Sequence, residues 1–213
     1  MRRAGIAVLV LLMLVLPGCI FLFLGPEILY EETFSGDTAA QWLQQTTETI
    51  SKYVESGRYH VRFLGSNAMF TSTRNLEQGP FANVQFDMDV THISGENTLC
   101  GAGILFRAAN WDNFYYFLVS PAGTYTIHKE VGGTDSVLVG WTAADAIYEG
   151  ATTNHLTVRA DGSTLTFLIN GQQVKQLIDA SIPSGDVGIR AQIYDGATDA
   201  HMSFDDIVVT ELE

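Results

Sequence analysis

The sequence predicts an all-β domain, an antiparallel two-sheet β-sandwich, preceded by one N-terminal hydrophobic helix. Three observations predict it. Several segments alternate apolar and polar residues with a period of two, short turns rich in glycine, proline and aspartate separate them, and no stretch beyond the N-terminus keeps a helical period. Aromatic and β-branched residues are plentiful, which favours strands over long helices. Many short strands with regular turns are typical of two packed sheets.

The chain divides into a hydrophobic segment and one domain. Residues 1–25 are predicted to be a membrane anchor or a lipoprotein signal, and residues 26–213 the sandwich domain. About 190 residues are enough to bury a sizeable core in one domain.

The N-terminal segment allows three interpretations. Residues 4–24 are apolar without a charge, and Arg2 and Arg3 precede them. A transmembrane helix of this length, at about 1.5 Å per residue, would cross a bilayer core of about 30 Å. Alternatively, "LPGC" resembles a lipobox with Cys19 as the lipidated residue, or the segment is an ordinary cleaved signal peptide. All three place the domain on the extracytoplasmic side of the membrane.

The charge of the chain limits its partners. It carries 11 Lys and Arg against 24 Asp and Glu, a formal net charge of −13. Such a surface repels phosphate backbones, so nucleic acid is not expected as a partner. A neutral ligand such as a sugar, or a cation such as Ca²⁺, is compatible with it.

The expected strands follow the alternation in chain order. Val84, Phe86, Met88 and Val90 share one face of a strand whose other face is polar. Residues 153–174 alternate around "ADGS" and "NG", which predicts two successive hairpins. Further strands are expected at residues 28–34, 59–63, 68–72, 100–108, 114–120, 123–130, 137–141, 185–192 and 202–212, and a short helix at residues 38–43.

Four stretches carry a resemblance to a known superfamily. They are "GILFRAANWDNFYYFLVSPAGTYTIHK", "NHLTVRADGSTLTFLINGQQV", "GDVGI" and "MSFDDIVV". Together they resemble the concanavalin A-like jelly roll, and within it the laminin-G-like and 3-keto-disaccharide hydrolase-like domains, over about residues 29–212. The resemblance implies a jelly-roll sandwich that binds carbohydrate or another surface ligand without catalysis. A glycoside hydrolase-like enzyme and a structural or adhesive surface domain are the alternatives, because the superfamily includes all three.

The aromatic stretch "FYYFLVS" indicates where a ligand would bind. Residues 114–119 are apolar on both faces of a strand, yet a sandwich has only one interior. The side chains of one strand face must therefore lie outside the core between the sheets, on a concave surface or under a loop or a ligand. Flat rings and nearby amides are the groups that recognise sugars. The candidate ligand-binding residues are Arg107, Trp111, Asn113, Tyr115 and Tyr125, and at least one ring among Trp111, Tyr115 and Tyr125 is expected on that face or its rim.

Acidic side chains suggest two further sites. Asp87 and Asp89 share one strand face about 6.5–7 Å apart, which suits either a glycosidase acid pair or a solvated polar face. The jelly-roll resemblance implies a structural Ca²⁺ between the first and last strands, with Glu32 and Asp205 as its ligands.

Other residues are expected to be structural. Trp42 is expected in the core, and the pattern leaves Trp141 unplaced. Cys100 has small and apolar neighbours, which is typical of a buried side chain. The five histidines show no metal-binding spacing, and the chain lacks hydrolase, phosphate-loop and dinucleotide motifs.

Overall fold

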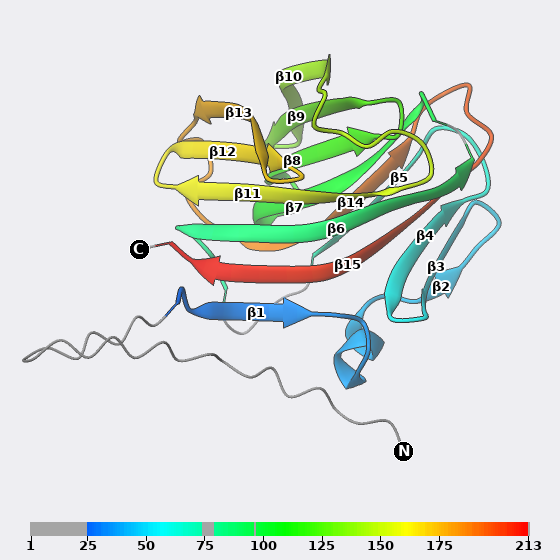
Figure 1. The fold of residues 1–213 in the computed structure, drawn as a ribbon, viewed down its shortest axis with the longest axis horizontal. Coiled ribbons are helices and arrows are strands. Elements are labelled where there is room, and N and C mark those ends of the chain that lie inside the picture. Colours follow the sequence, from blue (N-terminus) through cyan, green and yellow to red (C-terminus); the bar gives the residue numbers. More distant parts are fainter. Residues whose placement is uncertain (1–24, 74–78, 96, 213) are drawn as a thin grey trace, which may run out of the picture.

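The computed structural model describes residues 25–73, 79–95 and 97–212, and it confirms an all-β antiparallel two-sheet sandwich (Figure 1). One sheet has nine strands in the order β13-β12-β11-β6-β15-β4-β3-β2, with β1 also paired to β15. The other has six strands in the order β10-β9-β8-β7-β14-β5. The predicted N-terminal hydrophobic helix and Cys19 fall outside the described residues, so the helix stays a prediction. Within the part described, no helix is long and apolar enough to cross a membrane.

The strands of the nine-stranded sheet are β1 (Ile28–Glu32), β2 (Gln45–Thr46), β3 (Ile50–Glu55), β4 (Arg58–Phe63), β6 (Val84–Gly95), β11 (Thr153–Asp161), β12 (Thr164–Ile169), β13 (Gln172–Ile178) and β15 (Ala200–Glu211). Those of the six-stranded sheet are β5 (Ala68–Thr73), β7 (Cys100–Asn110), β8 (Asn113–Ser120), β9 (Thr124–Val131), β10 (Thr134–Ala143) and β14 (Asp186–Ile193). One 3-10 helix, η1, covers Asp37–Gln41, where the sequence predicted a short helix.

The predicted hairpins form where the turn residues place them. β11 pairs with β12 and β12 with β13, each antiparallel. The two turns place Gly162 at φ 52° and Gly171 at φ 79°, backbone angles that glycine adopts without a steric cost. β2 and β3 were not predicted, because the alternation fails there. Lys52 pairs with the buried Val61 and points inward, with its ammonium 5.0 Å from the centre of the Phe70 ring.

The core lies between the two sheets and is rich in rings. Phe106 and Tyr115 stack with centroids 5.2 Å apart, and Phe167 of the opposite sheet meets Phe117 edge to face at 5.2 Å. Trp42 is buried as expected, and its indole N–H donates to Glu32 at 3.2 Å. Aromatic pairs of this kind contribute about 0.5–1.5 kcal/mol beyond the area they bury.

Candidate ligand-binding face

Strand β8 has two buried faces, as its sequence predicts. Tyr115, Phe117 and Val119 belong to the core between the sheets. Phe114, Tyr116 and Leu118 instead form a separate apolar cluster with Leu105 and Ala108. Since β8 alternates, this second set lies on the outer side of the six-stranded sheet. The set that leaves the core is therefore the one without Tyr115.

Side chains of five neighbouring strands meet on this side of the sheet, which we call the outer face. Register places the residues of β7, β8, β9, β10 and β14 side by side. The outer face includes Gly101, Phe114, Tyr116, Leu118, Thr126, His128, Asp135, Trp141, Arg190, Gln192 and Tyr194.

Arg190 lies at the centre of the outer face. Its guanidinium carbon is 4.0 Å from the centre of the Tyr116 ring and 5.5 Å from that of Phe114. Its Nε donates to Gln192 Oε1 at 3.3 Å and its Nη1 to Thr71 Oγ1 at 3.3 Å. Only 4% of the residue is exposed, and this burial lowers the pKa of Arg190. A buried cation fixed on two rings gives the face a rigid floor.

Tyr116 is tied to β9 and β10. Its hydroxyl donates to Asp135 Oδ1 at 2.7 Å, and the His128 ring stacks on it with centroids 4.7 Å apart. His128 also contacts Asp135 Oδ2 at 3.0 Å and Thr126 Oγ1 at 2.8 Å. Burial, and then the carboxylate of Asp135, raise the pKa of Tyr116, so its hydroxyl stays protonated at neutral pH.

Trp141 is the exposed ring of the outer face. It is 40% exposed and meets Tyr194 edge to face, with centroids 6.2 Å apart. Its inner side rests on Gly101, where a Cβ would come within 2.8 Å of Trp141 Cη2 and 3.4 Å of Leu118 Cβ. The absence of a side chain at Gly101 thus lets the indole lie against the sheet. Its other side is open to solvent.

The alternation of β14 contains a signal for this face that was missed. In "DVGIRAQIY", Arg190, Gln192 and Tyr194 alternate with buried apolar residues. A long cation and an amide on one side of an otherwise apolar strand indicate a partly polar face packed against rings.

Two of the predicted ligand-binding residues lie at the β7–β8 turn: Trp111 within it and Asn113 at the first position of β8. Trp111 is 63% exposed and stands at the surface. Asn113 links this turn to the β9–β10 turn, because its Nδ2 donates to Asn110 Oδ1 at 2.8 Å and its Oδ1 accepts from the Gly132 N–H at 3.1 Å. Of the three candidate rings, Trp111 is the exposed one. That it lies on a concave ligand-binding face or its rim stays a prediction.

The other three predicted ligand-binding residues lie in the interior and hold loops together. Arg107, 2% exposed, donates to the carbonyls of Ala82, Gly162 and Ile182 at 2.8–3.3 Å. The hydroxyl of Tyr115 donates to Asp179 Oδ1 at 2.7 Å, and that of Tyr125 to the Val174 carbonyl at 3.2 Å. Burial raises the pKa of Tyr115 to about 12. Their surroundings support structural roles and offer a ligand little surface.

The expected calcium ligands are bonded to the protein. Glu32 Oε1 accepts from the Phe34 N–H at 2.7 Å and from Thr38 Oγ1 at 3.1 Å. Asp205 accepts from the Asp206 N–H at 2.9 Å and lies 3.7 Å from Arg58 Nε. Among the residues described, no group of three or more His, Cys, Asp or Glu is placed to hold a metal ion. The geometry gives the calcium expectation no support.

Asp87 and Asp89 are bridged by a histidine. His155 Nδ1 lies 2.8 Å from Asp89 Oδ1 and its Nε2 3.3 Å from Asp87 Oδ1, which also accepts from Thr157 Oγ1 at 2.6 Å. The hydrogen bonds that His155 donates to Asp87 and Asp89 raise the pKa of His155 to about 10. Burial alone would raise the pKa of Asp87, but hydrogen bonds from His155 and its neighbours hold it below its usual value. Asp87, held in its charged form by His155, is a poor general acid for glycoside hydrolysis.

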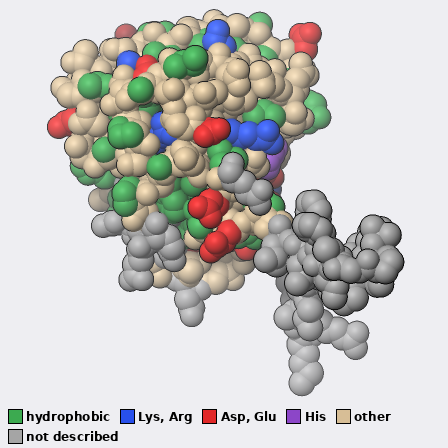
Figure 2. All heavy atoms as spheres, turned by 90° about the vertical axis from the view of Figure 1, so that its left-hand side faces the viewer, with side chains coloured by type: hydrophobic (Ala, Val, Ile, Leu, Met, Phe, Trp, Pro, Cys, Tyr) green, Lys and Arg blue, Asp and Glu red, His purple; other side chains and the backbone are tan. Residues whose placement is uncertain are grey.

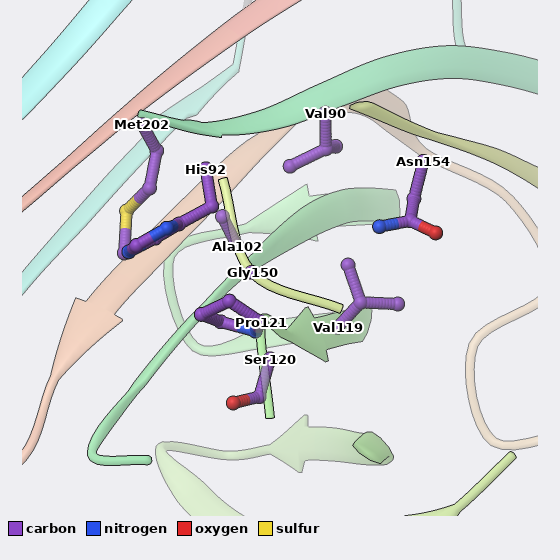
Figure 3. Close-up of a pocket in the computed structure, with 9 residues that line it drawn as sticks. All are labelled: Val90, His92, Ala102, Val119, Ser120, Pro121, Gly150, Asn154 and Met202. Atoms are coloured by element: carbon purple, nitrogen blue, oxygen red, sulfur yellow. The ribbon is translucent and has the colours of Figure 1, made fainter. Parts of the chain in front are cut away.

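The described part of the chain contains a small internal cavity and an open surface groove. The first, between the sheets, holds about 20 Å³, enough for about one water molecule, and the side chains of Val90, His92, Val119, Asn154 and Met202 are drawn around it in Figure 3. The second is an open groove of about 290 Å³. It is lined by Gly79, Pro80, Ala108, Ala109, Ser184, Gly185 and Asp186. On the end of the sandwich in Figure 2, acidic, basic and hydrophobic side chains are interspersed.

Comparisons with known proteins place the fold. No family model matches the chain. A TPR repeat-containing protein of Treponema pallidum (strain Nichols) is 35% identical over 107 residues, which are 50% of this chain and 13% of that protein. The chain therefore matches only a small part of that relative's length.

Solved structures share the sandwich at low sequence identity. A carbohydrate-binding module, CBM66 from Bacillus subtilis, has a TM-score of 0.59 at 18% identity, with 78% of this chain and 94% of that chain covered. A Bacillus subtilis protein of unknown function with a galectin-like fold has a TM-score of 0.63 at 12% identity, covering 86% and 96%. A GH43 protein from Bacillus licheniformis has a TM-score of 0.59 at 14% identity, covering 85% and 39%. The chain has the β-sandwich fold of these proteins, consistent with the jelly roll that its sequence resembles.

Proposed function

We propose that the chain is a non-catalytic carbohydrate-binding module whose ligand lies on the outer face of the six-stranded sheet. One observation carries the proposal: the Trp141 indole lies against Gly101 with its outer side exposed, on a face floored by Arg190 and Tyr116. An indole held against a sheet offers a sugar ring an apolar surface at little cost in conformational entropy.

Polar groups next to the indole supply the hydrogen bonds that a sugar needs. Gln192 Nε2 contacts the Tyr194 hydroxyl, whose ring meets Trp141. The Asp135 side chain is 46% exposed and keeps acceptor capacity beyond its bonds to Tyr116 and His128. A pyranose that stacks on Trp141 would find amide and hydroxyl groups at its edge. Asp135 lies six residues earlier on β10, where only a longer glycan would reach it. The carbohydrate-binding and glycoside hydrolase structures that share the fold support the same ligand class.

The anchor completes the proposal. Residues 4–24 are charge-free, and the first described strand, β1, follows closely at Ile28. We infer that the segment is a transmembrane anchor or a lipoprotein signal that holds the domain at the extracytoplasmic side of a membrane, where glycans are available.

A glycan array probed with the full-length chain tests the proposal, followed by affinity measurements on two tryptophan variants. Trp141→Ala removes the proposed stacking surface. Trp111→Ala is the matched control, because Trp111 is also exposed but lies in the β7–β8 turn. The proposal expects Trp141→Ala to weaken binding at least about tenfold and Trp111→Ala to leave it unchanged. The reverse result would move the site to the turn, and no binding to any glycan would reject the proposal.

A further inference from the structure

His60 and His201 meet on the polar side of the nine-stranded sheet, although they are far apart in the sequence. They lie on the neighbouring strands β4 and β15, which run side by side in Figure 1. His60 Nδ1 is 3.0 Å from His201 Nε2. The hydroxyl of Tyr53, on β3, is 3.3 Å from the same His201 nitrogen. Two imidazole nitrogens and a phenol oxygen therefore converge at one point.

We propose that His60 and His201 form a binding site for a divalent late transition metal ion, best suited to Cu²⁺, with Tyr53 beside the open coordination positions. The proposal is independent of the carbohydrate site, which lies on the other sheet.

The proton positions favour this site. His60 Nε2 lies 3.3 Å from the Glu55 carbonyl oxygen, which can only accept, so that nitrogen carries the proton. His60 Nδ1 then has a lone pair directed at His201. A backbone carbonyl that binds the remote N–H of an imidazole is the usual way in which proteins orient a metal-binding histidine. Without metal, the N–H of His201 Nε2 donates a hydrogen bond to His60 Nδ1. When a metal binds, His201 changes tautomer, so its proton is carried by Nδ1 and the lone pair of Nε2 becomes available to the metal.

The ring of His60 is also held in place. Tyr53 stacks on it with centroids 4.9 Å apart and planes within 5° of parallel. His60 is buried, whereas His201 is partly exposed and can turn to direct its lone pair at an ion. One fixed and one adjustable ligand allow the site to close without backbone movement.

The spacing indicates the metal. With metal–nitrogen bonds of about 2.0–2.1 Å, nitrogens 3.0 Å apart subtend an angle of about 90–95° at the ion. This angle suits adjacent corners of a square-planar or tetragonal site, which Cu²⁺ and Ni²⁺ prefer, better than a tetrahedral zinc site. Cu²⁺ also binds nitrogen ligands most tightly among the divalent first-row metals.

The charges around the pair are mixed. Metals bind the neutral imidazole through a ring-nitrogen lone pair, and the bond of His60 Nε2 to the Glu55 carbonyl leaves that lone pair on Nδ1. Arg58 and Arg62 oppose a cation, and Glu55 favours one. Two histidines amid these charges predict a site of moderate affinity.

Copper titration of the full-length chain, made without a polyhistidine tag, tests the proposal. We expect one equivalent of Cu²⁺ to bind, with the electron paramagnetic resonance signature of two imidazole nitrogens. His60→Ala and His201→Ala should each weaken binding at least about tenfold. Cu²⁺ should raise the melting temperature of the wild type but not that of His201→Ala.

The competing site is His155 with Asp87 and Asp89, so His155→Gln is the matched control and should bind Cu²⁺ like the wild type. If His60→Ala does not fold, His201→Gln, at the more exposed position, carries the test. Retained binding in His201→Gln, loss of binding in His155→Gln, or no copper binding by the wild type would each overturn the proposal.

Discussion

The Trp141 indole lies so close to Gly101 that a Cβ on Gly101 would come within 2.8 Å of Trp141 Cη2. Gly101→Val should therefore push the indole off the sheet and weaken glycan binding, with an overpacking cost of about 1–3 kcal/mol. Gly140→Ala is the control on β10, since nothing lies within 4 Å of a Cβ there. Tryptophan fluorescence and binding affinity check both variants. Equal binding by Gly101→Val and the wild type would contradict the role given to this contact.

Truncating rings should separate the core from the surface. Tyr115→Ala removes a fully buried ring and its bond to Asp179, and should cost about 3–5 kcal/mol of unfolding free energy. Trp111→Ala should change that free energy by less than about 0.5 kcal/mol, because the ring is exposed. Chemical denaturation measures both. A loss of about 3–5 kcal/mol of unfolding free energy in Trp111→Ala would show that the Trp111 ring stabilises the β7–β8 turn.

The bridge of His155 to Asp87 and Asp89 should make stability depend on pH. The pKa of His155 is about 10 in the folded chain against an ordinary 6.5, so its contribution is complete below pH 6.5 and is lost as the pH rises to 10. Because the His155 side chain is 45% exposed, solvent screens the bridge, and we expect it to contribute only about 1 kcal/mol to the free energy of unfolding. Denaturation from pH 6 to pH 10 should show this loss in the wild type and not in His155→Gln. Identical pH profiles would exclude the bridge as its source.

The same bridge should respond to acid in the opposite direction. The pKa of Asp87 lies below its ordinary 3.8, so the stability it contributes is present above that value and is lost as the pH falls below it. Asp87→Asn should reduce the loss of unfolding free energy between pH 5 and pH 2. A variant as acid-sensitive as the wild type would assign acid unfolding to other carboxylates.

The anchor prediction separates two kinds of membrane attachment. Cys19→Ser should abolish lipid labelling and processing if residues 16–19 are a lipobox, and should leave membrane retention and mass unchanged if residues 4–24 span the bilayer. Membrane fractionation and mass spectrometry of the wild type and of Cys19→Ser distinguish the two kinds of attachment. Recovery of the wild type as a soluble secreted protein would defeat both forms.

The fold was predictable because its signals are local. Alternation and turn residues located the strands from β4 onward, and the double apolar pattern of residues 114–119 showed that β8 has two covered faces. β2 and β3 escaped prediction because Lys52 occupies an inward position that the pattern reserves for an apolar residue.

The candidate sites were less predictable because they depend on register between distant strands. Which set on β8 faces the core is fixed by pairing, and Arg190 reaches Tyr116 only because β14 lies beside β7. His60 and His201 are 141 residues apart in the chain, so no spacing rule could join them. Arg107 was predicted to bind a ligand, yet a local backbone irregularity, with φ 48° at this residue, turns its side chain inward.

Oxidative footprinting of the full-length chain with and without a bound glycan tests the central claim most directly. The account predicts that the ligand protects Trp141 and Tyr194 from hydroxyl radicals while Trp111, exposed in its turn, reacts as before. Protection of Trp111 with Trp141 unchanged would contradict the account, because the ligand would then lie on the β7–β8 turn and not on the outer face.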